Sequence, residues 1–287
     1  MKLKLNISKS EIEKYYYIDK LRQIDIANIH NVSRSAVQRL QKKYDLQPLE
    51  NWEKKCSLSI SNIQREVLFG TALGDDCLYQ YSTSIYGTLM VCHAISQKEY
   101  VKLKYDIWKD FVTEAGMTEV KRDNGKRIVF KTVCHPEFLK YRKEYYDNKG
   151  IKVIKLFHLE RLTQISIAFL FQDDGSRCKN GGLAIHSNCF TLNEVEMICE
   201  YFRKKYSWNC YPQKRKENQW VVFFSNETSM DFSEFILPYV HPSMRYKLEG
   251  VYIKNPQRLN AVPFIYDNLT GKSQSELCGN TQNSKIE

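Results

Sequence analysis

Two pairs of adjacent aspartates are the residues of this 287-residue chain whose type and spacing could do chemistry. Asp75-Asp76 closes the stretch 61–76 (SNIQREVLFGTALGDD), and Asp173-Asp174 lies near the end of 160–175 (ERLTQISIAFLFQDDG). Both stretches carry apolar residues at helical spacing, so each pair is predicted to end a helix. One pair alone would indicate a helix entering a turn, but two pairs, with Asp174 lying 99 positions after Asp75, favour a shared site. Carboxylates bind hard divalent cations and repel one another without them.

The sequence after each acidic pair follows the same order, which predicts a helix, two strands, a helix, two strands and a helix, twice over. In the first half we expect strands at 77–83 and 88–95, a helix at 98–115, a ribbon at 118–133 that turns at 123–125, and a helical stretch at 136–147. In the second half we expect a strand at 183–189, a helix at 191–206, strands at 209–215 and 219–225 joined by a turn at 217–218, and a helical stretch at 229–240. Two such halves, 61–150 and 151–248, suggest a pseudo-two-fold axis.

The two stretches resemble the motifs of the LAGLIDADG homing endonucleases in their single-chain form, which carries two motifs. The first motif reads LFGTALGDD (68–76), the second reads IAFLFQDDG (167–175), and the resemblance extends over about 61–248. The sequence departs from the family pattern at Thr71, Leu73, Asp76, where glycine is frequent, and Phe169, where a small residue is common. The resemblance implies an α+β fold, with a β-saddle over two packed motif helices, and a site-specific double-strand DNA endonuclease.

The resemblance places the essential acids of the family at Asp75 and Asp174. Gly70 and Gly74 lie one turn apart on the first motif helix, which would let the second helix approach closely and bring the two acids together. Two like charges about 4 Å apart repel by about 4 kcal/mol at an effective dielectric constant near 20. We therefore expect Mg²⁺, with Mn²⁺ as a substitute, to be held there by Asp75 and Asp174 and to support phosphodiester hydrolysis.

Two lysines complete the catalytic set that the resemblance implies. Lys152 precedes the second motif helix, and Lys247 follows the last helix in RYKL. The expected role of both is to polarise the attacking water or to steady phosphate charge. The alternative for each is a solvated surface lysine.

The strands supply the expected DNA-recognition surface, because alternate residues of a strand share one face. In the first half the expected contact residues are Tyr79, Tyr81, Thr83, Lys121, Arg127 and Lys131. In the second half they are Arg177, Lys179, His186, Asn188, Gln213, Lys214, Arg215 and Lys216. In the resembling family such ribbons lie in the major groove of a long asymmetric duplex site, where side chains of these types read base edges. Any one of them could instead be a solvated strand residue.

Residues 1–48 are predicted to form a small all-α helix-turn-helix domain. Ser10, with Glu13 three residues later, has the spacing of a capping box. The segment 24–44 (IDIANIHNVSRSAVQRLQKKY) has the helix-turn-helix spacing, with Ser33 capping the last helix. The residues expected to face inward are Ile26, Ala27, Ile29, Val32, Val37 and Leu40. The residues expected to face DNA are Arg34, Ser35, Gln38, Arg39 and Lys42. A small helical bundle with a solvated basic face is the alternative.

Composition limits the class of protein and its partners. The net charge of +10 suits a polyanion. No apolar run approaches the roughly 20 residues of a membrane span, and the start has no signal-peptide core, so we expect a soluble, intracellular protein. The nine cysteines are scattered singly with no C-x-x-C pair, which favours free thiols in a reducing compartment over zinc or disulfides. Segments 49–60 and 249–287 are expected to be a linker and a partly disordered extension.

Two other functions fit the same residues. One is a non-cleaving nucleic-acid-binding protein, either a helix-turn-helix transcription regulator or an RNA-splicing maturase, on the same scaffold. The other is a basic structural protein whose aspartate pairs are incidental. The single-chain enzyme, expected to be monomeric, is the leading hypothesis because both acids of the motifs are intact.

Overall fold

The computed structural model divides the chain into two compact units, Met1–Ser59 and Ile60–Glu287. It describes residues 7–19, 21, 23–46, 58–82, 84–123, 125–179, 181–251, 262–265 and 267–270. Most of the expected linker and of the C-terminal extension lie outside the described residues. No helix in these ranges is long and apolar enough to cross a bilayer.

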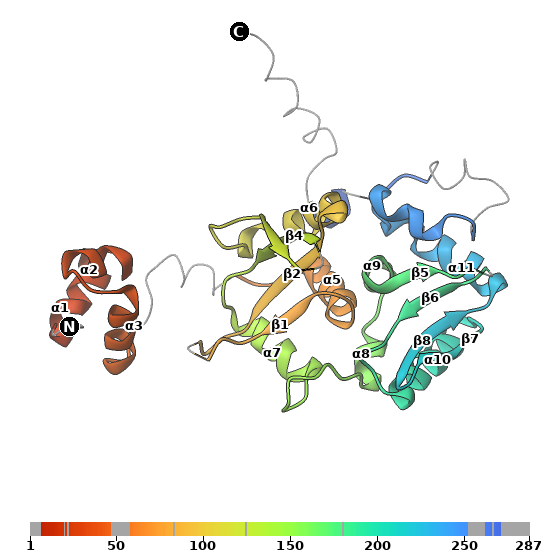
Figure 1. The fold of residues 1–287 in the computed structure, drawn as a ribbon, viewed down its shortest axis with the longest axis horizontal. Coiled ribbons are helices and arrows are strands. Elements are labelled where there is room, and N and C mark those ends of the chain that lie inside the picture. The colour runs from red at the N-terminus through yellow and green to blue at the C-terminus, as the bar shows by residue number, and fades with distance from the viewer. Residues whose placement is uncertain are drawn as a thin grey trace, which may run out of the picture. The chain divides into compact units, whose positions relative to one another are not determined.

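Short helices around a small apolar core form the described part of the first unit (Figure 1). They are α1 (Lys9–Glu13), the π-helical turn η1 (Lys14–Ile18), α2 (Gln23–Ile29) and α3 (Arg34–Lys43). The buried side chains are Ile7, Ile12, Tyr16, Ile26, Ala27, Val37, Leu40 and Leu46, with Val32 packed against them. The unit therefore has the all-α composition and most of the inward-facing residues that its sequence predicts.

Two local predictions for this unit were wrong. Ser8 caps α1, with its Oγ accepting the Glu11 N–H at 3.2 Å, so Ser10 lies inside the helix and forms no capping box. Ile29 is 54% exposed although it was expected to face inward. It follows the buried Ala27 by two positions, which is about 200° around a helix and therefore points away from the core.

The second unit contains two halves with the same element order. The first half comprises α5 (Asn62–Leu73), β1 (Cys77–Tyr79), β2 (Thr88–Ala94), η2 (Ile95–Gln97), α6 (Lys98–Ile107), η3 (Lys109–Phe111), β3 (Thr118–Arg122), β4 (Gly125–Lys131) and α7 (Pro136–Tyr145). The second comprises α9 (Gln164–Asp174), β5 (Gly175–Arg177), β6 (Leu183–His186), α10 (Leu192–Tyr206), β7 (Cys210–Lys216), β8 (Gln219–Phe224) and α11 (Asn226–Ile236). The remaining elements are α8 (Leu156–Glu160), which joins the halves, then η4 (Leu237–Tyr239), η5 (Pro242–Leu248) and α13 (Asp267–Thr270). The predicted repeat of α-β-β-α-β-β-α is confirmed.

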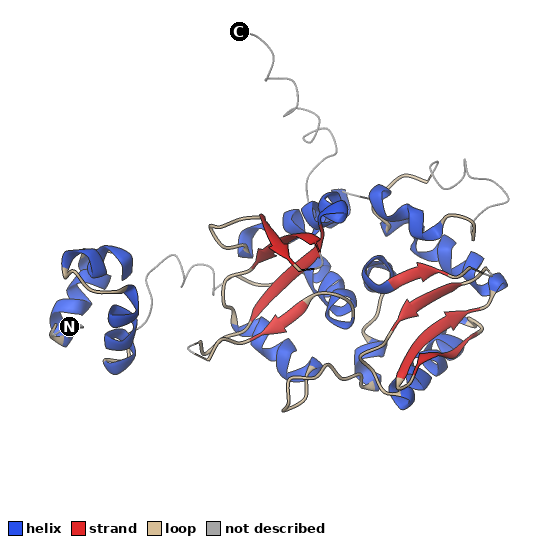
Figure 2. Ribbon diagram, in the orientation of Figure 1, coloured by secondary structure: helices blue, strands red, loops and turns tan. Residues whose placement is uncertain are grey.

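Each half builds one four-stranded antiparallel sheet. The strand orders are β1-β2-β4-β3 and β5-β6-β8-β7, so the two sheets have the same topology. Figure 2 shows them on either side of α5 and α9, with the other helices of the unit packed around them. One continuous apolar core joins both halves. The predicted α+β class is thereby confirmed.

The two motif helices, α5 and α9, pack tightly because small residues line their contact. A Cβ on Gly70 would overlap the main chain of Ser166, so only glycine fits there. The Ser166 hydroxyl donates to the Glu66 carbonyl at 2.8 Å, and the Thr163 hydroxyl donates to the Glu66 carboxylate at 2.7 Å. These contacts fix the start of α9 against the middle of α5.

Candidate active site

The carboxyl ends of the two motif helices bring Asp75 and Asp174 close enough that the charge of Asp75 affects the pKa of Asp174. Asp174 is the last residue of α9, whereas α5 ends at Leu73 and Asp75 lies in the turn that follows. Burial, then the Asp75 and Asp173 carboxylates, raise the pKa of Asp174 to about 8 against the opposing effect of Lys152 and Lys247. Asp75 and Asp174 are therefore close enough for their charges to repel.

This pair has the properties expected of ligands for a hard cation. The Asp75 side chain is 46% exposed. Asp174 is half-buried, and no hydrogen bond or ion pair within the described ranges holds its carboxylate. An acid that burial and a like charge drive toward its neutral form would be stabilised in its ionised form by a divalent cation. The two carboxylates thus fit a hard divalent cation such as Mg²⁺ or Mn²⁺, which prefers oxygen ligands.

Lys152 and Lys247 occupy equivalent places at the two helix ends. Lys152 Nζ donates to the carbonyl oxygens of Gly74 and, at 2.9 Å, Asp76. Lys247 Nζ donates to the carbonyl oxygens of Gln172 at 2.6 Å and Asp173 at 2.9 Å. Cations at the carboxyl end of a helix satisfy free carbonyls and oppose the negative end of the helix dipole. Neither lysine is the freely solvated surface residue that was its alternative.

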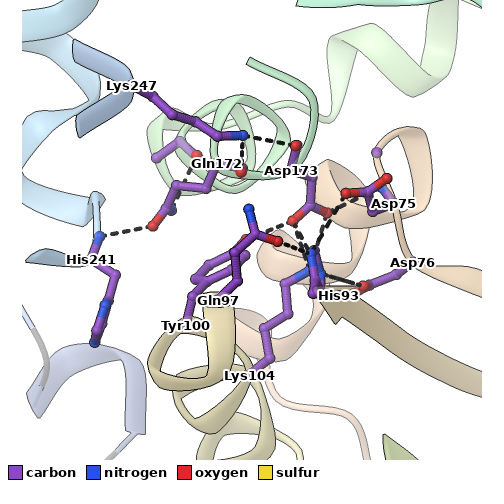
Figure 3. Close-up of polar contacts among 12 residues, drawn as sticks. Asp75, Asp76, His93, Gln97, Tyr100, Lys104, Gln172, Asp173, His241 and Lys247 are labelled. Atoms are coloured by element: carbon purple, nitrogen blue, oxygen red, sulfur yellow. Dashed lines mark hydrogen bonds and ion pairs between the residues drawn. The ribbon is translucent and has the colours of Figure 1, made fainter. Parts of the chain in front are cut away.

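A cluster of buried polar side chains lies next to Asp75 (Figure 3). Lys104 Nζ, fully buried, donates to one carboxylate oxygen each of Asp76 and Asp173 at 2.8 Å, and it contacts His93 Nε2 at 3.1 Å. The Tyr100 hydroxyl donates to Asp173 at 2.8 Å. Burial alone would lower the pKa of Lys104, but Asp173 and Asp76 outweigh it and raise that pKa. Burial would raise the pKa of Asp76, which the Lys104 ammonium lowers instead.

Asp76, His93 and Asp173 could by their ligand atoms alone hold a metal ion, because these atoms lie within 4.8 Å of one another. The Lys104 ammonium, however, lies within 3.1 Å of all three residues. A cation between these ligands would have to displace that ammonium.

The expected recognition residues of the first half fall only in part on one face. Tyr79 and Tyr81 share a face, since their hydroxyls contact each other and their rings pack edge to face. Lys131 lies over both rings, 5.8 and 6.0 Å from their centroids. Lys121 pairs with Lys126, next to Arg127 on the same strand, so Lys121 points to the opposite face from Arg127 and Lys131. Thr83 lies outside the described residues.

In the second half His186, Gln213 and Lys216 lie on the sheet face of Val221, since Lys216 pairs with Gln219 beyond a bulge, and Arg215 lies near His186. His186 and Gln213 both pair with Val221 and so share its face, and Ser176 contacts His186 Nε2 at 2.8 Å. Burial, then Arg215, then Lys247 lower the pKa of His186, which places both cations nearby. The strand register puts two of the expected residues on the other face, namely Arg177, paired with Leu183, and Lys214, paired with Trp220. Lys179, Asn188 and Lys216 are exposed.

On α3 of the first unit all five expected contact residues, Arg34, Ser35, Gln38, Arg39 and Lys42, are exposed. Gln23 at the start of α2 orders two of them. Its Oε1 accepts from Arg34 Nε at 3.0 Å and from Gln38 Nε2 at 3.3 Å. Its own amide donates to the buried Gln41 at 2.6 Å. The exposed face of α3 is thus anchored to the core of the unit.

Comparison with known proteins identifies the second unit. The model of the LAGLIDADG DNA endonuclease family matches residues 65–232. The chain belongs to this family. Its two motifs and two halves make it a single-chain member. The match does not include the first unit, for which helix-turn-helix DNA binding remains a prediction.

Relatives of this LAGLIDADG protein include a probable intron-encoded endonuclease 1 of Wickerhamomyces canadensis, 27% identical over 68% of this chain and 87% of the relative. The cytochrome b mRNA maturase bI2 of Saccharomyces cerevisiae is 34% identical over 65% of this chain and 47% of the maturase. Among solved structures, the homing endonuclease I-WcaI bound to its DNA recognition sequence aligns with a TM-score of 0.62 and 25% identity. That alignment covers 72% of this chain and 96% of I-WcaI.

Sequence reasoning missed the cluster of His93, Tyr100 and Lys104, and it gave no role to Asp76 and Asp173. The sequence does contain a pattern that indicates these buried residues. Lys104 stands four residues after Tyr100 and four before Trp108, on the buried side of α6. His93 stands two residues after the buried Val91, on the core side of β2. Polar residues in phase with an apolar face indicate a buried network.

Proposed function

We propose that the protein is a site-specific endonuclease that hydrolyses both strands of a DNA duplex with divalent metal ions held by Asp75 and Asp174. The observation that carries the proposal is the pairing of these acids at the ends of two packed helices, with the pKa of Asp174 raised to about 8. Membership of the LAGLIDADG DNA endonuclease family and the likeness to a DNA-bound homing endonuclease support it.

Bound Mg²⁺, or Mn²⁺ in its place, would supply the Lewis acid that activates a water molecule and stabilises the leaving 3′ oxygen. The chain's own part is to hold two carboxylates at the seam of α5 and α9. Lys152 and Lys247 lock the helix-end carbonyls beside these carboxylates. In this proposal their ammonium groups also steady the phosphate charge that develops at each strand.

The open faces of the two sheets would grip the duplex. The first presents Tyr79, Tyr81 and Lys131, and the second presents His186, Gln213 and Lys216. Since the two faces differ in residue type, the site they recognise would be asymmetric, and one chain carrying both halves would act as a monomer. The basic face of α3 would add contacts from the first unit. The seven described cysteines are all free, which suits the reducing compartment that we propose for it.

A second candidate is an RNA-splicing maturase on the same scaffold. The likeness to the yeast cytochrome b mRNA maturase favours it, although the chain covers only 47% of that protein. The two functions are not exclusive, because the surfaces that grip a nucleic acid and the acids that cut it are separate sets of residues.

A cleavage assay tests the endonuclease. A duplex target is first selected from a randomised library by binding in Ca²⁺, and it is then cut in Mg²⁺. Asp75→Asn and Asp174→Asn should each lower the cleavage rate at least about 100-fold, since the metal ligand that each removes is worth several kcal/mol, while binding in Ca²⁺ persists. Asp231→Asn, an exposed acid on α11, serves as the matched control. Full cleavage by either motif variant would remove the assignment. Binding to RNA without cleavage of any selected duplex would favour the maturase.

A further inference from the structure

We propose that the Lys104 ammonium takes the place of a metal ion in the Asp76–His93–Asp173 group and that, through Asp173, it positions Asp75 against the second motif helix. In this proposal Lys104 is a positioning residue. The inference deepens the proposed function, and only the cleavage part of its test rests on that function.

The first observation is the position of the Lys104 ammonium between the three side chains. Lys104 Nζ lies 2.8 Å from Asp76 Oδ1, 2.8 Å and 3.1 Å from the two Asp173 oxygens, and 3.1 Å from His93 Nε2. These are hydrogen-bond distances, and all three donors of one ammonium can be used among them. Asp76 Oδ2 is buried and has no partner among the described residues, so it is the atom through which a competing ion would bind. This makes an ion-binding test decisive.

The second step is the link across the seam. Asp173 Oδ2 accepts the backbone N–H of Asp75 at 3.3 Å, so a side chain of the second motif holds the main chain of the first. The space for it exists because residue 74 is glycine, where a Cβ would lie 2.7 Å from the Asp173 Cβ. Lys104 and Tyr100 together fix the Asp173 carboxylate in this place.

The third step is a parallel route through His93. A charged ammonium has no lone pair, so His93 Nε2 must accept from Lys104, and the ring proton is then assigned to Nδ1. His93 Nδ1 faces Gln97 Oε1 at 3.1 Å and Asp75 Oδ2 at 3.6 Å. Lys104 thus influences both the backbone and the carboxylate of Asp75.

Among the described residues, the direct contacts of the cluster with a motif acid are with Asp75. Aligned position for position, the second motif has Asp173 where the first has Gly74, and Gly175 where the first has Asp76. A buried acid that could accept from a lysine behind Asp174 is therefore missing from the second motif. Loss of Lys104 should consequently disturb the two strand cleavages unequally, whereas loss of general stability would affect both alike.

The first test measures Mn²⁺ binding to the full chain without DNA, by electron paramagnetic resonance. Asp76→Asn and His93→Gln should bind as many Mn²⁺ ions as the unaltered protein, because their group already holds an ammonium. The loss of one ion in either variant would overturn the proposal.

The second test follows amide hydrogen exchange by NMR in Lys104→Met. The Asp75 amide should exchange at least about tenfold faster, while the Gly74 amide, which donates to Gly70 within the helix, keeps its protection. Lys102→Met on the exposed side of α6 is the matched control. Unchanged protection of Asp75 would overturn the proposal. If Lys104→Met does not fold, the charge-balanced Asp76→Asn/Lys104→Met variant takes its place in this test, with the same expected results.

The third test labels each strand of the selected duplex separately. Lys104→Met should slow one strand at least about tenfold more than the other, so that nicked DNA accumulates, and Asp76→Asn/Lys104→Met should retain this bias. Equal slowing of both strands, or recovery in the double variant, would overturn the positioning role. Absence of cleavage by the unaltered protein would contradict the proposed function, and the first two tests would still decide the role of Lys104.

Discussion

Lys152 and Lys247 share one equivalent contact at the ends of the two motif helices, because Gly74 and Asp173 hold the same motif position. Each ammonium donates to two main-chain carbonyls, those of Gly74 and Asp76 for the first lysine and those of Gln172 and Asp173 for the second. These contacts relate the two motif ends to each other in the second unit. They also show that both lysines act on the main chain that carries the motif acids.

This symmetry predicts matched effects of removing either lysine. Lys152→Met and Lys247→Met should each lower the DNA cleavage rate at least about tenfold. Each removes one ammonium that neutralises both the helix-end carbonyls and the bound phosphate. Each should cost about 1–3 kcal/mol of unfolding free energy, because each leaves two carbonyls of buried residues without the lysine donor. Cleavage kinetics and urea unfolding measure the two effects. Lys149→Met, an exposed lysine in the preceding turn, should leave both unchanged. A large effect of one lysine and none of the other would contradict the equivalence.

The raised pKa of Asp174 predicts a specific dependence of stability on pH. Since this pKa is about 8 in the folded protein and ordinary in the unfolded chain, the folded state binds the extra proton between about pH 4 and pH 8. The contribution of Asp174 to stability is therefore present at low pH and is lost as the pH rises through about 8. Thermal unfolding in EDTA from pH 5 to 9 should show a fall that is shallower in Asp174→Asn, which stays neutral. Identical slopes in the two proteins would refute this.

The close contact of the motif helices predicts that Gly70→Ala destabilises the protein. Alanine in a helix is ordinarily better than glycine by about 0.5–1 kcal/mol. Here the added Cβ would meet the main chain of Ser166, so we expect a net loss of about 1–3 kcal/mol as the helices move apart. Urea unfolding compares this variant with Asn62→Ala, an exposed position in the first turn of α5. A gain of stability in Gly70→Ala would show that α5 and α9 can separate without cost.

The exposed basic face of α3 predicts a contribution of the first unit to DNA binding. Arg34→Ala and Arg39→Ala should each weaken binding to the selected duplex and lower the slope of log affinity against log salt concentration by about 1 for each phosphate that the variant no longer neutralises. Fluorescence anisotropy at several salt concentrations measures both. Lys9→Ala on α1, which removes one positive charge from the same unit, is the control. An unchanged slope in both arginine variants would favour the alternative of a solvated helical bundle.

Periodicity predicts the repeat because each element buries one face, and the order of helices and strands follows from where that face lies. Prediction from periodicity fails where the orientation or role of one residue depends on the residue that it pairs with or packs against in the fold. Lys121 looked equivalent to Lys131 by alternation, but its pairing with Lys126 turns it to the other face. Ser8 and Ser10 have the same capping chemistry, and the sequence alone does not distinguish Ser8, which caps α1, from Ser10, which lies inside it.

Some residues of the candidate site can be predicted from the sequence, and others cannot. Two aspartate pairs at helix ends are visible in the sequence, and so are two lysines that match the family. The role of Lys104 is ambiguous from the sequence alone, because a lysine within an amphipathic helix normally extends its ammonium to water. Its role depends on Asp173, 69 positions away, and no local pattern joins residues so distant.

The two motifs differ in sequence at their ends, and this difference limits how two copies of one half could form a symmetric dimer. A dimer made from two copies of the first half would face Gly74 with Gly74, leaving each Lys104 with Asp76 but without the acid that ties it to the opposite helix. A dimer made from two copies of the second half would face one Asp173 with another, with neither the glycine that admits it nor the lysine that neutralises it. The two halves therefore behave as complementary pieces, and a symmetric ancestor or chimera would need compensating changes at positions 74, 76, 104 and 173 together.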